Sequence, residues 1–191
     1  MAADLTEYVT LLAKVEAFTG PVSTRRSADL TCQAGCSDCC QVWLTVSSVE
    51  AEALRRGLAQ LDEVARSRVR ARGIEQAQRE AAVESQRPRC AMLEDDGTCA
   101  VYGVRPLVCR TQGHALRYPS GFVPQAAVMA RAGSGDVTHC PLNYTERAPA
   151  AEDVLDAERV DVILAVVNAR FCASEGRDPD GRHALSSLAS E

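Results

Sequence analysis

Nine cysteines stand in this chain of 191 residues, and most of them fall into two short segments. The first segment contains Cys32, Cys36, Cys39 and Cys40, and the second contains Cys90, Cys99 and Cys109. Thiols that recur at such short spacing can be aimed at one centre, as a metal site requires. The chain is therefore expected to fold in a way that presents sulfur atoms from two separate segments.

The rest of the composition favours metal or redox chemistry over disulfides. With 46% hydrophobic residues, the chain can build a core without crosslinks. The first residues lack the basic and apolar regions of a secretory signal. The longest apolar run, residues 162–167, is far too short to span a bilayer. We therefore expect a cytoplasmic protein with no membrane partner, in which thiols stay reduced.

The charge pattern argues against a nucleic-acid partner. The net charge is −5, and no block of like charge stands out. Arginine does occupy every second position from Arg66 to Arg72, but on a helix these side chains spread around the cylinder. The sequence predicts a solvated helix face there.

The pattern of apolar residues predicts a mainly α fold with small antiparallel β hairpins (α+β) around a cysteine-rich metal site. Helices are expected over residues 3–18, where Gly20-Pro21 would end the helix, and over 48–61, 62–85 and 152–171. Ser47 and Glu50 form a capping box before the second helix, and Gly73 is expected to interrupt the third. In the last helix, Val154, Leu155, Val162, Ile163, Val166 and Val167 are the expected buried residues.

Extended structure is predicted in shorter pieces. Residues 41–46 alternate as a short strand would, and residues 90–102 form a hairpin about the turn Asp96-Gly97. A second hairpin is expected over residues 118–129, and a glycine-rich loop over 131–137. Residues 1–176 are interpreted as a single domain, followed by a polar, frayed tail over 177–191.

Two further cysteines and two histidines are weaker candidates for the site. Cys140 precedes Pro141, whereas Cys172 ends the predicted apolar helix and is more often simply a core residue. His114 and His139 lie near cysteines and could replace a thiolate ligand, although each is more often an ordinary polar residue.

Arginines flank the second cysteine segment. A four-thiolate site with zinc, or with an oxidised 4Fe-4S cluster, carries a net charge of about −2. Arg89, Arg105 and Arg110 lie beside the cysteines and could offset that charge. Arg105 and Arg110 could also bind an anionic substrate or cofactor, but charge compensation is the favoured interpretation.

The cysteine segments resemble those of the YkgJ-type cysteine-cluster family, described as zinc- or iron-chelating proteins with a CxxCxxCC signature. Residues 32–40 read CQAGCSDCC, with one more residue in the first gap than the signature has. Residues 89–110 read RCAMLEDDGTCAVYGVRPLVCR, and this block is the closer match.

The resemblance implies metal binding and no settled reaction. It carries Cys32, Cys36, Cys39, Cys40, Cys90, Cys99 and Cys109 over as ligands, and Cys140 would be an eighth. Eight thiolates would serve two four-thiolate sites, and one site with several spare thiols fits equally well. The adjacent pair Cys39-Cys40 makes two neighbouring centres attractive.

Three functions remain open from the sequence. The first is an iron–sulfur protein, with a 4Fe-4S cluster and a redox or enzymic role towards a small molecule or a protein redox partner. The second is a zinc protein with closed four-thiolate sites. The third is a metal-free thiol redox protein. The spacing of Cys32, Cys36 and Cys39 also matches the radical-SAM signature, but Asp38 stands where that family favours an aromatic residue.

Overall fold

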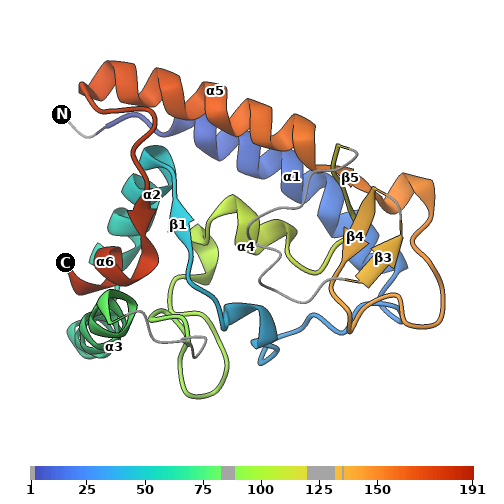
Figure 1. The fold of residues 1–191 in the computed structure, drawn as a ribbon, viewed down its shortest axis with the longest axis horizontal. Helices are drawn as coiled ribbons and strands as arrows, with labels where there is room; N and C mark the ends of the chain where they lie inside the picture. Colours follow the sequence, from blue (N-terminus) through green and yellow to red (C-terminus); the bar gives the residue numbers. More distant parts are fainter. Residues whose placement is uncertain (1–2, 83–88, 120–131, 135) are drawn as a thin grey trace. The chain divides into compact units, whose positions relative to one another are not determined.

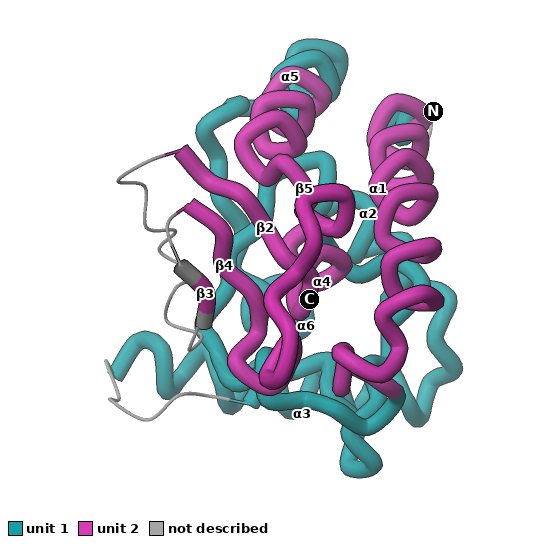
Figure 2. Tube along the Cα trace, turned by 90° about the vertical axis from the view of Figure 1, so that its right-hand side faces the viewer, with its two compact units in different colours: residues 1–5, 34–106, 168–191 teal, residues 6–33, 107–167 magenta. Residues whose placement is uncertain are grey.

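The computed structural model of the chain describes residues 3–82, 89–119, 132–134 and 136–191. Two compact units can be distinguished within it (Figure 2). Unit 1 comprises residues 1–5, 34–106 and 168–191, and unit 2 comprises residues 6–33 and 107–167. Each unit is thus assembled from stretches that lie far apart in the sequence.

The prediction of a mainly α fold with small β elements is confirmed (Figure 1). The helices are α1 (Thr6–Arg25), α2 (Ser48–Ala59), α3 (Glu63–Ala81), α4 (Leu107–Thr111), α5 (Ala157–Glu175) and α6 (Leu185–Ser190). The strands are β1 (Thr45–Val46), β2 (Leu116–Arg117), β3 (Ala132–Ser134), β4 (Val137–His139), β5 (Leu155–Asp156) and β6 (His183–Ala184). The described residues also form short 3-10 helices at η1 (Asp38–Cys40), η2 (Tyr102–Val104) and η4 (Ala151–Asp153).

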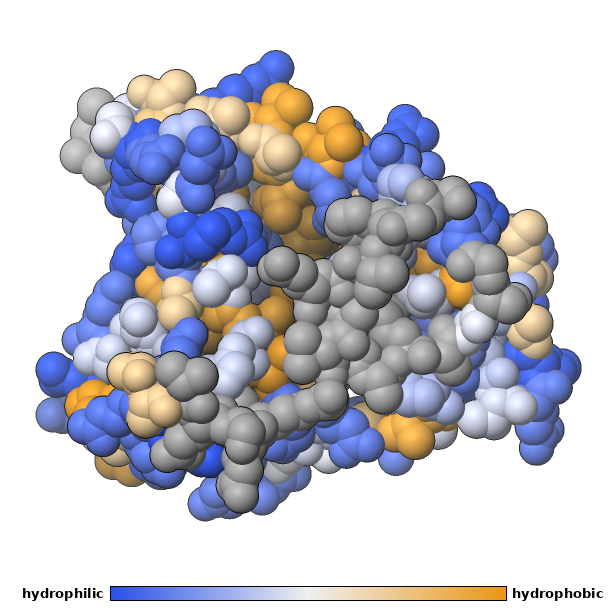
Figure 3. Space-filling view, viewed as in Figure 1, coloured by the Kyte–Doolittle hydropathy of each residue, from blue (hydrophilic) through white to orange (hydrophobic). Residues whose placement is uncertain are grey.

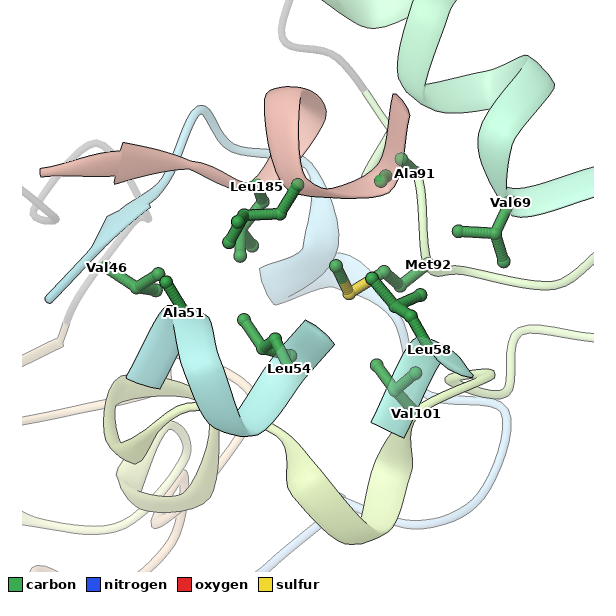
Figure 4. Close-up of a cluster of buried hydrophobic side chains, with 11 residues drawn as sticks. Val46, Ala51, Leu54, Leu58, Val69, Ala91, Met92, Val101 and Leu185 are labelled. Carbon is green, nitrogen blue, oxygen red and sulfur yellow. The ribbon is translucent and has the colours of Figure 1, made fainter. Parts of the chain in front are cut away.

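Unit 1 is built around α2, whose start the sequence predicts correctly. Ser47 and Glu50 form the expected capping box, and Asp62 caps α3 by accepting a hydrogen bond from the N–H of Ala65. Aliphatic side chains from α2, α3, α6 and the segment after Cys90 converge on one cluster (Figure 4). Leu54 and Leu188 are almost fully buried there, and each such burial stabilises the fold by about 1.5–3 kcal/mol.

The end of the chain differs from the expected frayed tail. Residues 183–184 form β6, which pairs antiparallel with β1 so that Thr45 lies opposite Ala184. The following helix, α6, buries Leu185, Leu188 and Ala189 in the cluster of Figure 4. Two turns of helix are too short to give a clear periodic signal in a polar sequence, so sequence reasoning does not detect this element.

Gly73 does not interrupt α3, contrary to the prediction. A Cβ at this position would lie 2.7 Å from the backbone of Ala189. The glycine therefore permits α6 to approach α3 closely, and this contact compensates for the poor helix propensity of glycine.

Unit 2 contains a four-stranded sheet in the order β3-β4-β2-β5. β4 pairs antiparallel with β3 and β2, whereas β2 and β5 are parallel, so the sheet is mixed. The stretch predicted as a glycine-rich loop, residues 131–137, thus contains β3 and the first residue of β4. Most of the second predicted hairpin, over residues 118–129, lies outside the described residues.

Helix α1 continues through Gly20 and Pro21, where the sequence predicts its end. A proline removes one helical hydrogen bond, but the next turn is held by burial and charge. Val22 is fully buried, and both Arg25 and Arg26 form ion pairs with the buried carboxylate of Asp153. These contacts outweigh the local cost of the proline.

Helix α5 begins at Ala157, five residues later than predicted, because β5 occupies the residues before it. Leu155 and Val167 are buried as expected, but Val162 and Val166 are 58% and 46% exposed and Ile163 is also exposed. Hydrophobic residues accordingly gather on the surface over α5 (Figure 3). In the described part of the chain, no helix combines the length and apolarity needed to cross a membrane.

Candidate metal centre

In unit 1, Cys90 and Cys99 each open the same kind of tight turn. The carbonyl oxygen of Cys90 accepts a hydrogen bond from the N–H of Leu93, and that of Cys99 accepts one from the N–H of Tyr102. The chain between the turns folds back on itself, and Leu93 and Cys99 form an antiparallel bridge. The predicted hairpin is thus present, and it carries one cysteine at the start of each turn.

The same turns direct a backbone N–H at each sulfur. The N–H of Met92 donates a hydrogen bond to the Cys90 sulfur, and the N–H of Val101 donates one to the Cys99 sulfur. Burial acts the other way: it raises the pKa of the Cys90 thiol to about 11 and also raises the pKa of Cys99. A bound metal ion would remove these protons, because metals bind the thiolate form.

Cys39 and Cys40 reach the same region of unit 1 on η1. The N–H of Cys90 donates a hydrogen bond to the carbonyl oxygen of Cys40 over 2.8 Å. The pKa of Cys39 is raised far above its ordinary value. The main cause is a hydrogen bond between the Cys39 and Cys40 side chains, and burial is the second cause. The Cys90 sulfur is close enough for negative charge on Cys39 and on Cys99 to raise its pKa. Thiols of the two sequence segments therefore share one neighbourhood.

Cys36 follows a glycine that touches the hairpin. Gly97, at the hairpin turn, has φ +81°, and a Cβ on it would lie 2.7 Å from the carbonyl oxygen of Gly35. Gly35 itself has φ +90°. Both positions favour glycine because L residues rarely adopt this conformation. The loop before Cys36 is thereby held against the hairpin that carries Cys90 and Cys99.

Two arginines lie near these thiols. Arg105, a predicted site residue, acts electrostatically on Cys99 and stacks its guanidinium carbon 3.7 Å from the centre of the Tyr102 ring. Arg72 acts on Cys90 and donates a hydrogen bond to the carbonyl oxygen of Ala91 over 2.8 Å. The sequence does not predict Arg72 as a site residue, because it belongs to the run of arginines from Arg66 to Arg72 that is predicted to form a solvated helix face. Arg89, also predicted, pairs with Asp95.

In unit 2, Cys32 borders a cavity of about 250 Å³. The residues that line it include Ser23, Ser27, Gln112, His114 and Asn143. The Asn143 side-chain amide donates a hydrogen bond to the Cys32 sulfur over 3.2 Å. Asn143 is 1% exposed, and sequence reasoning missed it because a lone asparagine three residues after Cys140 carries no recognisable motif.

The other two predicted ligands of unit 2 lie on separate elements. Cys109 is on α4, which packs against α1, and Cys140 follows β4. Arg110, predicted to bind a cofactor or to compensate charge, is buried and paired with Glu16. His139 is also buried, and its Nδ1 lies 3.0 Å from the carbonyl oxygen of Cys140, which orients the ring.

The donor set fits a soft metal. All nine cysteines lie in the described residues and none forms a disulfide. Cys172 is buried, and its thiol donates a hydrogen bond to the side-chain oxygen of Asn168. Thiolates are the ligands that select zinc and iron–sulfur clusters. Within the described ranges, no group of three or more His, Cys, Asp or Glu side chains is already arranged to hold an ion. The predicted ligands divide into five on unit 1 and three on unit 2.

Comparison with protein-family models gives one match. The model described as "CxxCxxCC: Putative zinc- or iron-chelating domain" matches residues 31–132, just over half of the chain. This range includes every predicted ligand except Cys140. Searches of the curated proteins and of the solved structures give no match.

Proposed function

Since the chain belongs to the CxxCxxCC family of zinc- or iron-chelating domains, we propose that it holds an iron–sulfur centre with a redox or enzymic role. The ligands proposed in unit 1 come from Cys36, Cys39, Cys40, Cys90 and Cys99. The finer choice of a 4Fe-4S cluster follows from the usual four-thiolate ligation of such clusters. A cytoplasmic location, as the sequence predicts, would keep the thiols reduced before the centre is inserted.

One observation carries the proposal: the Cys90 sulfur interacts electrostatically with both Cys99 and Cys39. Two of these thiols come from the hairpin and one comes from η1. These three soft donors would supply most of the four thiolates that a cluster requires. Arg72 and Arg105 would offset part of the negative charge that a bound centre adds.

The number of thiols in unit 1 favours a cluster over a single ion. A structural zinc ion takes four ligands in a small tetrahedron, whereas unit 1 contains five candidate thiols. Two of them, Cys39 and Cys40, are adjacent, and adjacent side chains are hard to place on one small tetrahedron. A 4Fe-4S cluster is larger than a single zinc ion and binds thiolates at separate iron atoms, so adjacent cysteines can be accommodated more easily. The N–H groups of Met92 and Val101 would tune its reduction potential through their hydrogen bonds to sulfur.

Zinc is the second candidate, and the paired turns favour it. Cys90 and Cys99 open matching turns, each with an N–H directed at the sulfur. Closed four-thiolate zinc sites stabilise small hairpin-rich regions in this manner. In that case the centre would be structural or would serve metal handling, and it would carry no redox chemistry.

The cysteines of unit 2 extend the proposal. Cys32, Cys109 and Cys140 are proposed as further thiolate ligands, with His114 or His139 in place of a fourth thiolate. Whether the chain holds one centre or two follows from the amount of metal bound per chain.

The test is anaerobic purification followed by analysis of iron, zinc and acid-labile sulfide per chain. We expect a brown protein with broad visible absorption and comparable amounts of iron and sulfide, and with bleaching on reduction by dithionite. If the protein is colourless and contains stoichiometric zinc, the cluster proposal fails and the zinc site is supported. Absence of both metals at stoichiometric levels would leave only metal-free thiol chemistry, and the proposal would fail.

A further inference from the structure

Asn143 is a buried amide whose hydrogen bonds join three segments of unit 2. Its Oδ1 accepts hydrogen bonds from the N–H and the hydroxyl of Thr31, both over 2.9 Å. Its Nδ2 donates to the carbonyl oxygen of Gly113 over 2.8 Å and to the Cys32 sulfur over 3.2 Å. The side chain therefore connects the residue before Cys32, the segment after Cys109 and Cys32 itself.

These bonds use the amide fully. The side-chain amide has two N–H donors and one carbonyl acceptor with two lone pairs, and each of the four has a partner here. Because Thr31 and Gly113 fix the plane of the amide, one N–H can only point at the Cys32 sulfur. Asn143 is 1% exposed, so water has little access to the amide itself, whereas Cys32 is exposed and open to a ligand.

Gly113 lies next to both the Cys32 sulfur and the Asn143 amide. Its φ is +98°, and a Cβ at this position would lie 2.5 Å from the Cys32 sulfur. The backbone at Gly113 thus provides both the space for the sulfur and the carbonyl oxygen that orients Asn143. Only glycine satisfies the space and the conformation together.

Asn143 also belongs to the turn that starts at Cys140. Its N–H donates a hydrogen bond to the carbonyl oxygen of Cys140 over 3.0 Å. The backbone of this one residue is therefore tied to a second candidate ligand, while its side chain holds the first.

We propose that Asn143 positions Cys32 as a metal ligand and tunes it with an N–H···S hydrogen bond. The inference rests on the proposed function, because it takes Cys32 to be a thiolate ligand. An N–H donor draws electron density from a metal-bound thiolate, which changes the metal–sulfur bond and raises the reduction potential of a cluster. Asn143 lies outside the residues that the family model matches, so the resemblance does not assign this role.

The test compares Asn143→Asp with Thr31→Val in the full chain. Asn143→Asp keeps the size and the acceptor but removes both donors, whereas Thr31→Val removes one hydrogen bond to Asn143 and leaves the bond to sulfur. We expect Asn143→Asp to shift the thiolate-to-metal absorption bands and to weaken metal affinity by about 10-fold or more. Thr31→Val is expected to change both the bands and the affinity much less than Asn143→Asp, because the N–H of Thr31 still donates to Oδ1 and the N–H···S bond remains. Identical bands and affinities for Asn143→Asp and Thr31→Val would overturn the proposal.

A second measurement does not depend on metal. The side-chain amide protons of Asn143 are followed by ¹⁵N-edited NMR in chelator-treated protein and in Cys32→Ser, with Cys172→Ser as the control. We expect Cys32→Ser to move one of the two amide protons and Cys172→Ser to move neither. If Cys32→Ser moves neither proton, the contact is absent and the proposal fails. If the purified protein contains no metal but Cys32→Ser still moves an amide proton of Asn143, the proposed function fails, whereas the contact between Asn143 and Cys32 is confirmed.

Discussion

The N–H of Cys90 donates a hydrogen bond to the carbonyl oxygen of Cys40 over 2.8 Å. This bond joins the two cysteine segments of unit 1 through the backbone, so it does not require that either thiol be deprotonated. A preformed metal site rarely exists in an unfolded chain. Here part of the arrangement is already held by the backbone, which reduces the conformational entropy lost when a metal binds.

Replacement of the hairpin cysteines is expected to remove metal. Cys90→Ser and Cys99→Ser each delete one soft donor from unit 1, so metal per chain should fall to half or less when the purified variants are analysed. Cys172→Ser is the matched control, because Cys172 is buried and hydrogen-bonded to Asn168 and to the carbonyl oxygen of Asp178. Metal loss that is equal in all three variants would contradict the assignment of Cys90 and Cys99.

The metal-free protein should lose stability as the pH rises from about 9 to about 11. Burial raises the pKa of Cys90 to about 11 from the ordinary thiol value of 9.0. The unfolded chain then ionises first, so stability is complete below the unfolded pKa and is lost as the pH approaches the folded pKa. Cys39 and Cys99 act in the same direction. Urea unfolding at several pH values should show a smaller decline for Cys90→Ser, and an unchanged decline would refute the prediction.

Gly97→Ala should weaken both the hairpin and metal binding. Gly97 has φ +81°, and the new Cβ would meet the carbonyl oxygen of Gly35. The strain is expected to destabilise the protein by about 1–3 kcal/mol, measured by denaturant unfolding. Gly103→Ala is the control, because a Cβ there has no heavy atom within 4 Å. The prediction would be wrong if the two variants were equally stable.

Asp153→Asn should destabilise the protein by about 2–3 kcal/mol at neutral pH. Burial alone would raise the pKa of Asp153, but hydrogen bonds from Arg26 and Arg25 outweigh it and hold the pKa below 3.8. The stabilisation is therefore present above pH 3.8 and is lost as the pH falls through the folded pKa. Arg147→Ala removes a mostly exposed arginine from its pair with Asp29, which keeps Arg26 as a partner, and should cost at most about 1 kcal/mol. Equal thermal shifts for the two variants would argue against the buried ion pairs.

Gly73→Ala and Gly20→Ala should have opposite effects. Both glycines lie inside helices, where alanine is favoured by about 0.5–1 kcal/mol. A Cβ at Gly20 meets nothing within 4 Å, whereas one at Gly73 meets the backbone of Ala189 at 2.7 Å. Gly20→Ala should raise the free energy of unfolding, and Gly73→Ala should lower it. A gain at both positions would mean that α3 and α6 are not in close contact.

The sequence predicts the local elements of unit 1 well. The capping box at Ser47 and the hairpin turn at Gly97 each follow from interactions between residues a few positions apart. The predictions are wrong where contacts with residues far away in the sequence determine the local structure. Pro21 remains inside α1 because Asp153, more than a hundred residues away, binds the next helical turn. Periodicity in one segment contains no information about such a partner.

The residues of the candidate site also fall into those that the sequence predicts and those that it does not. Motif spacing identifies the cysteines, because ligand spacing is a local property of the sequence. Arg72 and Asn143 approach their sulfur atoms only through the folded chain. Neither residue type is unusual where it stands, so neither could be distinguished from ordinary polar residues on a helix or a turn.

The core of unit 1 also determines when, during synthesis of the chain, the metal site can be completed. Leu54 and Met92 are synthesised long before Leu185 and Leu188, yet all four pack in one cluster. On the ribosome, the cysteines from Cys36 to Cys99 therefore emerge while one wall of their supporting core does not yet exist. We expect the nascent chain to carry these thiols unprotected, and metal insertion to follow translation of α6.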